Sequence, residues 1–315
     1  MKTLNPALGN TFMFLTVLFS VFAAFFIETP FLIMGMDPAD IDDTLINGLF
    51  PLIGLFLPFL AFMAMTKRPL KEVAPIKPIS FANVALILGM ALFLQPAALF
   101  VSELSSVFFG NDVSETISGF VVKQPFHIVV ITSCLFPAVF EELLTRGAVL
   151  SCYRNVGVKK AAVINGLFFG ILHMNPEQFF YAFMYGVAFT YFVYYTRSIV
   201  ASFLAHFSIN FSQVALVSYS YKLLPQEDID SYINPTTPGE GLSLLFPSFV
   251  IAVFSMLAFS VLFYIFANYN KRKNAEDDIT GDFAPIDRSP QRTFTWSFFA
   301  LVAVFIIFTL FNLFS

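Results

Sequence analysis

The chain has 315 residues, of which 57% are hydrophobic and only 12% charged, and its mean hydropathy is +0.77. Soluble globular domains carry about 25% charged residues, so this composition excludes an ordinary soluble protein. No basic patch suggests a nucleic-acid partner, and the two cysteines, eighteen residues apart, provide no disulfide framework. Residues 1–315 are therefore expected to form a single integral membrane domain of the all-α class, a polytopic bundle of transmembrane helices.

Nine apolar segments are candidates for crossing a hydrocarbon core about 30 Å thick. In chain order they cover residues 10–28, 44–66, 80–102, 125–151, 160–174, 178–195, 198–219, 242–268 and 293–314. The first segment is alternatively a cleaved signal peptide, although it lacks a clear small-x-small cleavage site. The fifth is short. We expect a bundle of eight or nine spans.

The loops between these segments alternate in charge. Loop 67–79 contains four Lys or Arg residues, whereas loop 29–43 contains four aspartates and no basic residue. If the N-terminus is cytoplasmic, fourteen of the seventeen Lys and Arg residues lie on the cytoplasmic side, as the positive-inside rule requires. The pattern predicts a cytoplasmic N-terminus and a cytoplasmic loop over residues 269–292. The acidic external loops and Phe-rich spans favour a bacterial inner membrane.

The fourth segment contains the stretch PAVFEELLTR, with three ionisable side chains that each cost about 3 kcal/mol at the bilayer centre. Glu142 and Arg146 are four residues apart and share a helix face, which predicts an ion pair with a mainly structural role. Glu141 lies about 100° around the helix from Glu142 and does not share this partner. Pro137 is expected to bend the helix just before the glutamates.

Two later segments place further polar groups at a similar depth. His173 ends the fifth segment, and His206 and Asn210 share one face of the seventh. Counted from the cytoplasmic helix ends, Glu141, His173 and His206 lie about 14 to 20 Å deep at 1.5 Å per residue. Phe169 precedes His173 by one turn and forms an aromatic wall.

A carboxylate, two imidazoles and a carboxamide at one depth indicate acid–base chemistry on a peptide bond. Glu141 is the expected base for water, and the histidines are expected to orient that water or protonate the leaving amine. Asn210 is expected to donate a hydrogen bond to the oxyanion. No G-x-S-x-G, H-E-x-x-H or intramembrane pair of aspartates is present, so other intramembrane protease chemistries fit poorly.

Three short motifs carry a resemblance to a known family. In chain order they are EExxxR (141–146), FxxxH (169–173) and HxxxN (206–210). In order and spacing they resemble the motifs of the CAAX protease and bacteriocin-processing family of intramembrane proteases, which includes the type II CAAX prenyl endopeptidases. The resemblance covers residues 125–220, segments four to seven, and implies that this is the catalytic core. It also implies a conical intramembrane cavity open to the cytoplasmic side.

The resemblance implies a role for individual residues. The residues implied as catalytic are Glu141, His173, His206 and Asn210. Those implied as supporting are Glu142, Arg146 and Phe169. The resemblance permits a water activated by glutamate alone or one bound to a divalent metal such as zinc, whose ligands would be Glu141, His173 and His206.

The leading interpretation is an endopeptidase that hydrolyses a bond in a membrane-associated peptide or protein, prenylated or not. One alternative is a catalytically silent relative that binds a membrane partner or confers bacteriocin immunity. Another is a proton-coupled transporter, since buried Glu and His also mark proton paths. The absence of an obvious internal repeat weighs mildly against a transporter.

Overall fold

The computed structural model describes residues 4–35, 43–110, 112–223, 238–276 and 292–314. The regular structure in these ranges is helical, and they contain no strand. The longer helices are α1 (Pro6–Ile33), α5 (Phe81–Phe109), α10 (Pro176–Thr196), α11 (Val200–Leu223), α13 (Pro238–Glu276) and α14 (Trp296–Phe314).

Two of the expected spans are built from consecutive helical pieces. The second span consists of α2 (Asp43–Phe50), a π-helical turn (Pro51–Phe56) and α3 (Leu57–Thr66). The fourth consists of α7 (Phe126–Val129), a π-helical turn (Val130–Leu135), α8 (Phe136–Glu142) and a second π-helical turn (Leu143–Val149). The remaining helices are α4 (Leu70–Val73), α6 (Asp112–Lys123) and α9 (Val158–Leu172).

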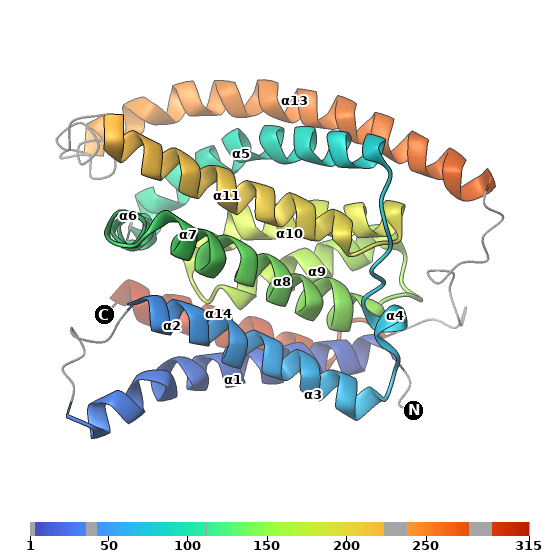
Figure 1. Cartoon of the computed structure of the whole chain (residues 1–315), viewed down its shortest axis with the longest axis horizontal. Coiled ribbons are helices and arrows are strands. Elements are labelled where there is room, and N and C mark those ends of the chain that lie inside the picture. Colours follow the sequence, from blue (N-terminus) through green and yellow to red (C-terminus); the bar gives the residue numbers. More distant parts are fainter. Residues whose placement is uncertain (1–3, 36–42, 111, 224–237, 277–291, 315) are drawn as a thin grey trace.

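The helices lie side by side, with their ends gathered at two opposite ends of the bundle (Figure 1). α13 and α5 form one edge, α1 and α14 lie near the other, and α8 to α11 occupy the centre. We call the end that contains residues 67–80 and 152–157 the basic end. The opposite end, where α6 runs across the bundle, is the acidic end. The polypeptide therefore passes back and forth between two ends whose loops differ in charge.

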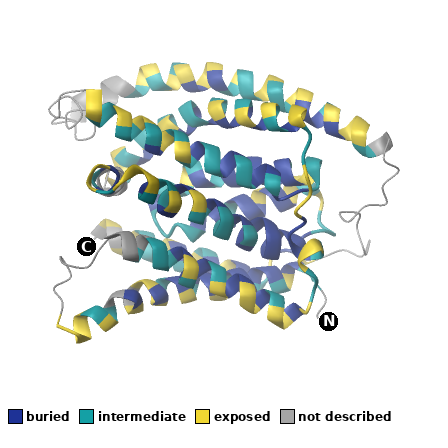
Figure 2. Ribbon diagram, viewed as in Figure 1, coloured by how far each residue is buried: buried dark blue, intermediate teal, exposed yellow. Residues whose placement is uncertain are grey.

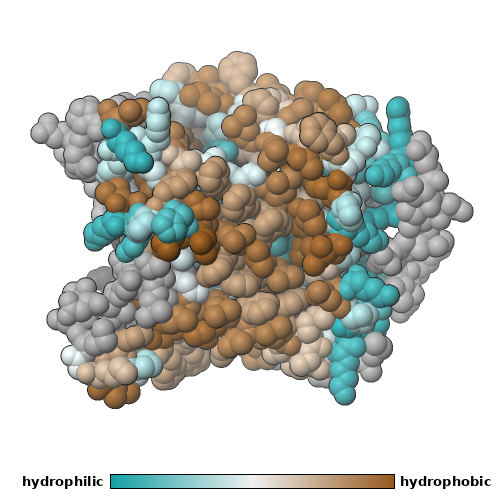
Figure 3. Space-filling model, in the orientation of Figure 1, coloured by the Kyte–Doolittle hydropathy of each residue, from teal (hydrophilic) through white to brown (hydrophobic). Residues whose placement is uncertain are grey.

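Helices long and apolar enough to cross a membrane cover Pro6–Ile33, Gly48–Thr66, Phe81–Phe109, Phe126–Val149, Val200–Leu223 and Leu245–Asn274. Exposed residues are frequent on the outer helices, and buried residues gather in the central helices (Figure 2). Figure 3 shows a hydrophobic belt between more hydrophilic ends. The protein is thus an all-α polytopic membrane protein, as predicted. All nine expected segments contain helix, and the number of crossings stays a prediction.

α13 is longer than the eighth predicted span. Asn83 of α5 and Asn270 of α13 exchange two side-chain hydrogen bonds, of 3.0 and 2.8 Å, and so hold the two helices in register. The basic run Lys271–Lys273, which the sequence placed in loop 269–292, belongs to the last turns of this helix. Residues 277–291 of that loop lie outside the described residues.

α9 and α10 form a hairpin whose outer ends both lie at the basic end (Figure 1). α9 has 15 residues and is about 22 Å long at 1.5 Å per residue, less than the hydrocarbon thickness of about 30 Å. At the tip, the Asn175 side chain accepts hydrogen bonds from the backbone N–H groups of Glu177 and Gln178 and so caps α10. The hairpin therefore places His173, the residue that ends α9, inside the bundle.

Two glycines allow the arms of this hairpin to touch. A Cβ atom on Gly186 would lie 2.7 Å from the Cα of Gly166, and a Cβ atom on Gly166 would lie 2.9 Å from the carbonyl oxygen of Phe183. Small residues of this kind let membrane helices approach backbone to backbone. The contact fixes the position of α9, and hence of the aromatic and imidazole side chains at its end.

We expect Gly186→Ala to destabilise the protein by about 1–3 kcal/mol, because the added methyl group meets backbone atoms that cannot rotate away. Thermal unfolding of the purified protein in detergent measures the loss. Gly119→Ala in α6 is the matched control, since nothing lies within 4 Å of a Cβ atom there. Equal melting temperatures for the two variants would contradict the packing described here.

Candidate active site

The residues that the sequence singled out meet in one cavity of about 270 Å³. Those lining it are Glu141 from α8, Phe169 and His173 from the end of α9, and His206 and Asn210 from α11. These positions are far apart in the sequence, and their convergence agrees with the common depth expected from helix lengths. The structure therefore brings together all four residues expected to be catalytic.

Glu141 lines this cavity, and one of its two carboxylate oxygens, Oε2, is buried. Its Oε2 atom lies 4.0 Å from Nε2 of His206, and the Glu141 side chain is 15% exposed. Oε2 has no hydrogen-bond partner among the described residues. A separation of 4.0 Å is too long for a direct hydrogen bond, and a polar pair at such a distance is suited to bridging by water. Glu141 thus has the acceptor that a base needs.

Glu142 forms the ion pair expected with Arg146, with 2.9 Å between Oε1 and Nη1, and both side chains are almost fully buried. The same Oε1 atom lies 3.0 Å from Nδ1 of His206. A carboxylate held by a guanidinium accepts hydrogen bonds, so Nδ1 carries a proton, and in the neutral imidazole the lone pair is then on Nε2. Glu142 is therefore a positioning residue for His206 as well as a partner of Arg146. Spacing along one helix did not reveal this interhelical contact.

Arg146 ties the fourth span to the α9–α10 hairpin. Its Nη2 atom donates to the carbonyl oxygen of Gly186 at 3.1 Å. Its guanidinium carbon lies 4.3 Å from the ring centroid of Phe169 and 5.2 Å from that of Phe189, which is within the range of cation–π attraction. Arg146 thus holds Phe169 in place while it neutralises Glu142.

His173 is oriented by the backbone of its own helix. Its Nδ1 atom lies 2.8 Å from the carbonyl oxygen of Phe169. Since a carbonyl oxygen can only accept, Nδ1 donates and the neutral ring keeps its lone pair on Nε2. The Phe169 ring lies edge-on to both imidazoles, 5.2 Å from the His173 centroid and 5.7 Å from that of His206. Both histidines are therefore fixed in the same tautomer against one aromatic side chain.

Asn210 is positioned by a contact with the fourth span. Its Nδ2 atom donates to the carbonyl oxygen of Ser133 at 3.2 Å, and the other N–H of the carboxamide is left for a ligand in the cavity. Ser133 belongs to the π-helical turn that precedes Pro137. π-helical turns recur at functional sites, and a proline that removes a backbone donor disturbs the regular helical ladder. The bend expected at Pro137 is thus accompanied by a widened turn that supplies the carbonyl group for Asn210.

Asn165 and Thr190 form hydrogen bonds that link α9 and α10 to the helical turn after Glu142. The sequence analysis did not identify either residue. Asn165 Nδ2 donates to the Thr145 carbonyl oxygen at 2.9 Å, and Thr190 Oγ1 donates to Asn165 Oδ1 at 3.1 Å. All three side chains are buried. An asparagine within an apolar helix was the available signal, because such a residue needs a polar partner.

The metal ligands permitted by the resemblance, Glu141, His173 and His206, do not form a metal site in this structure. Among the described residues, no three His, Cys, Asp or Glu side chains gather closely enough to hold a metal ion. A zinc site of this type needs three protein ligands about 2.0–2.2 Å from one point. The arrangement does not fit a resident zinc ion.

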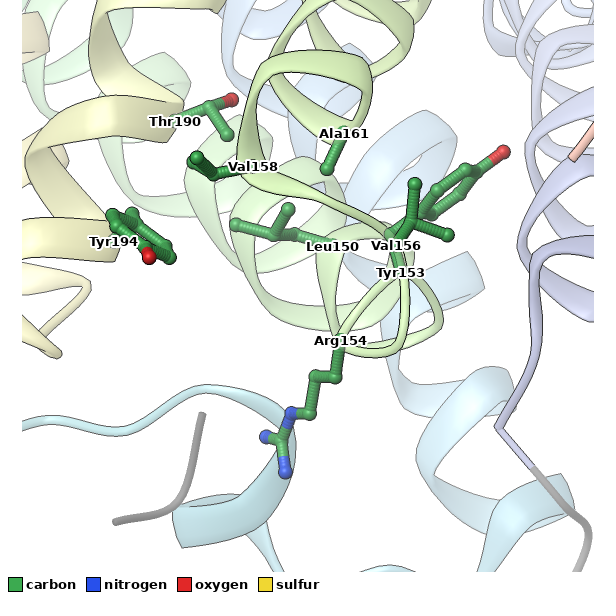
Figure 4. Close-up of a pocket in the computed structure, with 8 residues that line it drawn as sticks. All are labelled: Leu150, Tyr153, Arg154, Val156, Val158, Ala161, Thr190 and Tyr194. Atoms are coloured by element: carbon green, nitrogen blue, oxygen red, sulfur yellow. The ribbon is translucent and has the colours of Figure 1, made fainter. Parts of the chain in front are cut away.

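A second, much smaller cavity of about 40 Å³ lies near the basic end. Its lining residues are Leu150, Tyr153, Arg154, Val156, Val158, Ala161, Thr190 and Tyr194 (Figure 4). The guanidinium group of Arg154 points away from the other side chains. The lining contains neither a carboxylate nor an imidazole, so this cavity cannot supply the acid–base chemistry of the larger one.

The larger cavity extends toward the acidic end. Besides the polar residues, it is lined by Phe120 of α6 and by Gln213 and Val217 in the second half of α11. Under the positive-inside rule the acidic end is the non-cytoplasmic end, whereas the resemblance implies a cavity open to the cytoplasmic side. The face of the membrane to which the cavity opens stays a prediction.

Comparison with known proteins supports the resemblance seen in the motifs. Residues 123–212 match the family model described as Type II CAAX prenyl endopeptidase Rce1-like. No curated protein and no solved structure matches the chain. The matched segment, less than a third of the chain, contains every residue expected to be catalytic or supporting. The predicted relation to the CAAX protease family is thus confirmed, and at the level of the family it indicates an intramembrane protease that acts on peptide or protein substrates.

Proposed function

We propose, from the relation of residues 123–212 to the type II CAAX prenyl endopeptidases, that this chain is an intramembrane endopeptidase in which Glu141 activates the hydrolytic water. The observation that carries the proposal is that Glu141, whose buried Oε2 atom has no hydrogen-bond partner among the described residues, lines a cavity together with two oriented imidazoles and a carboxamide. The catalytic residues are Glu141, His173, His206 and Asn210.

In the proposed reaction, a water molecule in the cavity contacts both Glu141 and His206 and donates one hydrogen bond to the carboxylate. Glu141 accepts a proton from this water as its oxygen attacks the carbonyl carbon of the scissile bond. The lone pair on Nε2 of His206 accepts the second hydrogen bond and so orients the nucleophile. The C–N bond is still intact at this stage, and the charge lies on the former carbonyl oxygen.

The tetrahedral intermediate then collapses. The available N–H of Asn210 donates to the oxyanion and lowers its energy. The proton held by Glu141 passes to the leaving amine, directly or through Nε2 of His173, as the C–N bond breaks. Each cycle consumes one water, releases one carboxylic acid and one amine, and returns Glu141 to its ionised form.

The proposal is tested by comparing the termini of membrane proteins from cells that contain the native chain with those from cells that contain Glu141→Gln. We expect peptides with new termini only in the presence of the native chain, because the substitution removes the base without removing the protein. Identical termini in the two membranes, with both proteins present in equal amounts, would overturn the peptidase proposal. A phenotype that survives Glu141→Gln would favour a silent binding or immunity protein.

Cleavage is expected to be insensitive to metal removal, because the proposed base is a side chain and the described residues form no three-ligand cluster. The measurement is the cleavage rate of the purified protein before and after dialysis against a strong chelator, alongside metal analysis of the same sample. An activity lost on chelation and restored by stoichiometric zinc would contradict the mechanism while leaving the peptidase function intact.

A further inference from the structure

We propose that Tyr185 is a further catalytic residue, whose hydroxyl group donates a hydrogen bond to the oxyanion alongside Asn210. This inference rests on the proposed function and deepens it by adding a second donor to the charge that develops on the substrate. It is carried by the position of Tyr185 on the cavity face of α10, by its level relative to Asn210 and by the state of its hydroxyl group.

The proposed reaction provides the oxyanion with a single donor. One N–H of the Asn210 carboxamide is used on the carbonyl oxygen of Ser133, so one N–H is left for the substrate. The neutral imidazoles of His173 and His206 each use their Nδ1–H group on another oxygen and offer a lone pair at Nε2. Several donors aimed at one oxyanion stabilise it more than one does, so a further donor in the cavity would speed the reaction.

One face of α10 lines the cavity. The residues concerned are Gln178, Ala182, Tyr185 and Phe189, which follow one another at intervals of four, three and four residues. Such spacing places side chains on a single stripe of a helix. Tyr185 therefore lies in the middle of the stripe that α10 turns toward the cavity.

Tyr185 also lies at the level of Asn210. α10 and α11 follow one another through a short turn, run in opposite directions and pack together. The rings of Phe189 and His206 are 5.5 Å apart between their centroids. Tyr185 precedes Phe189 by four residues and Asn210 follows His206 by four, so each lies about one turn further along its helix in the same direction. Both residues line the cavity, and they do so at one height.

The hydroxyl group of Tyr185 is buried and has no hydrogen-bond partner among the described residues. The residue is 6% exposed, and its ring lies parallel to that of Phe189 with 5.9 Å between centroids. A phenylalanine would make the same ring contact without the cost of about 1–3 kcal/mol for an unsatisfied polar group. Such groups are rare in folded proteins, and a catalytic role is one explanation for them. Catalytic hydrogen bonds commonly form only when the substrate is bound.

The proposed contact requires no additional reactant. As water attacks, the electron pair of the carbonyl double bond moves to the oxygen, which accepts hydrogen bonds from the Tyr185 O–H and the Asn210 N–H. No proton passes to or from the tyrosine, and the double bond re-forms when the C–N bond breaks. A charged oxygen is the stronger acceptor, so the contact favours the transition state over the bound substrate and acts on kcat.

The test is Tyr185→Phe, which removes one oxygen atom and keeps the ring. Cleavage is measured on the peptide substrate identified by terminus mapping, and thermal unfolding is measured on the same preparation. We expect kcat to fall about 100- to 1,000-fold, the usual effect of removing one oxyanion donor, with KM unchanged. The melting temperature should stay equal or rise, because an unsatisfied hydroxyl group is lost.

Two other tyrosines provide matched controls. Tyr191→Phe makes the same change on α10 at a residue that does not line the cavity, and should alter neither kcat nor the melting temperature. The Tyr153 hydroxyl donates to Oδ1 of Asn10, so Tyr153→Phe should lower the melting temperature and leave kcat unchanged. Loss of activity without loss of stability is therefore expected of Tyr185→Phe alone among the three.

The inference is overturned if Tyr185→Phe keeps kcat within about twofold of the native value, or if it raises KM at an unchanged kcat. It is also overturned if the loss of activity is matched by a lower melting temperature. In each case cleavage by the native chain and its loss in Glu141→Gln would still support the peptidase proposal. Absence of cleavage by the native chain would refute the proposed function and this inference with it, so the two failures are distinguishable.

Discussion

Replacing Arg146 by Ala should destabilise the folded protein by about 3–5 kcal/mol, which is the typical cost of leaving one member of a buried ion pair uncompensated. Glu142 would keep its charge at a site where its side chain is 1% exposed. The same substitution removes the hydrogen bond to the Gly186 carbonyl oxygen and the contact with the Phe169 ring. The fraction of protein that remains monodisperse in detergent on heating measures the effect.

A surface pair and a double variant serve as controls for this prediction. Arg68 and Glu72 are 3.3 Å apart but partly exposed, so Arg68→Ala should cost less than about 1 kcal/mol. The double variant Glu142→Gln, Arg146→Met removes both charges and should recover most of the stability. It should not recover cleavage, because His206 then lacks its carboxylate partner. A fully active double variant would show that the Glu142–His206 contact has no role in positioning.

Replacing Glu141 by Gln should lower the cleavage rate about 100- to 10,000-fold, the contribution typical of a general base, and leave the thermal stability unchanged. Glu141 Oε2 has no hydrogen-bond partner among the described residues, so its loss breaks no structural contact. The adjacent Glu142→Gln is the matched control: it makes the same chemical change one residue away, and should lower stability as well as activity. If both variants behaved alike, the division of roles between the two glutamates would be wrong.

Much of the fold was predictable because a bilayer imposes simple rules. Backbone polar groups must be satisfied within each span, so apolar segments of about 20 residues become helices. The convergence of Glu141, His173 and His206 was also predictable, since depth follows from residue count along a regular helix. The pairing of Glu142 with Arg146 followed from spacing within one helix.

Contacts between helices were not predictable in the same way, because they depend on how each helix is rotated and how closely it approaches its neighbours. The bond between Glu142 and His206 joins residues 64 positions apart, and no spacing rule connects them. No spacing rule predicts the close approach of Gly166 and Gly186 either. The short fifth segment, expected over residues 160–174, is the helix α9 over Val158–Leu172, but the sequence did not show that the end of this helix bounds the site.

The most direct test of the account is cleavage by the purified chain, reconstituted in lipid vesicles with the substrate found by terminus mapping, in water enriched in ¹⁸O. We predict that the new carboxyl terminus carries one ¹⁸O atom per cleavage, since the attacking oxygen comes from water, and that Glu141→Gln produces no such terminus while remaining folded. Absence of cleavage by the purified native chain, or equal ¹⁸O incorporation by Glu141→Gln, would contradict the assignment of Glu141 as the base of an intramembrane peptidase.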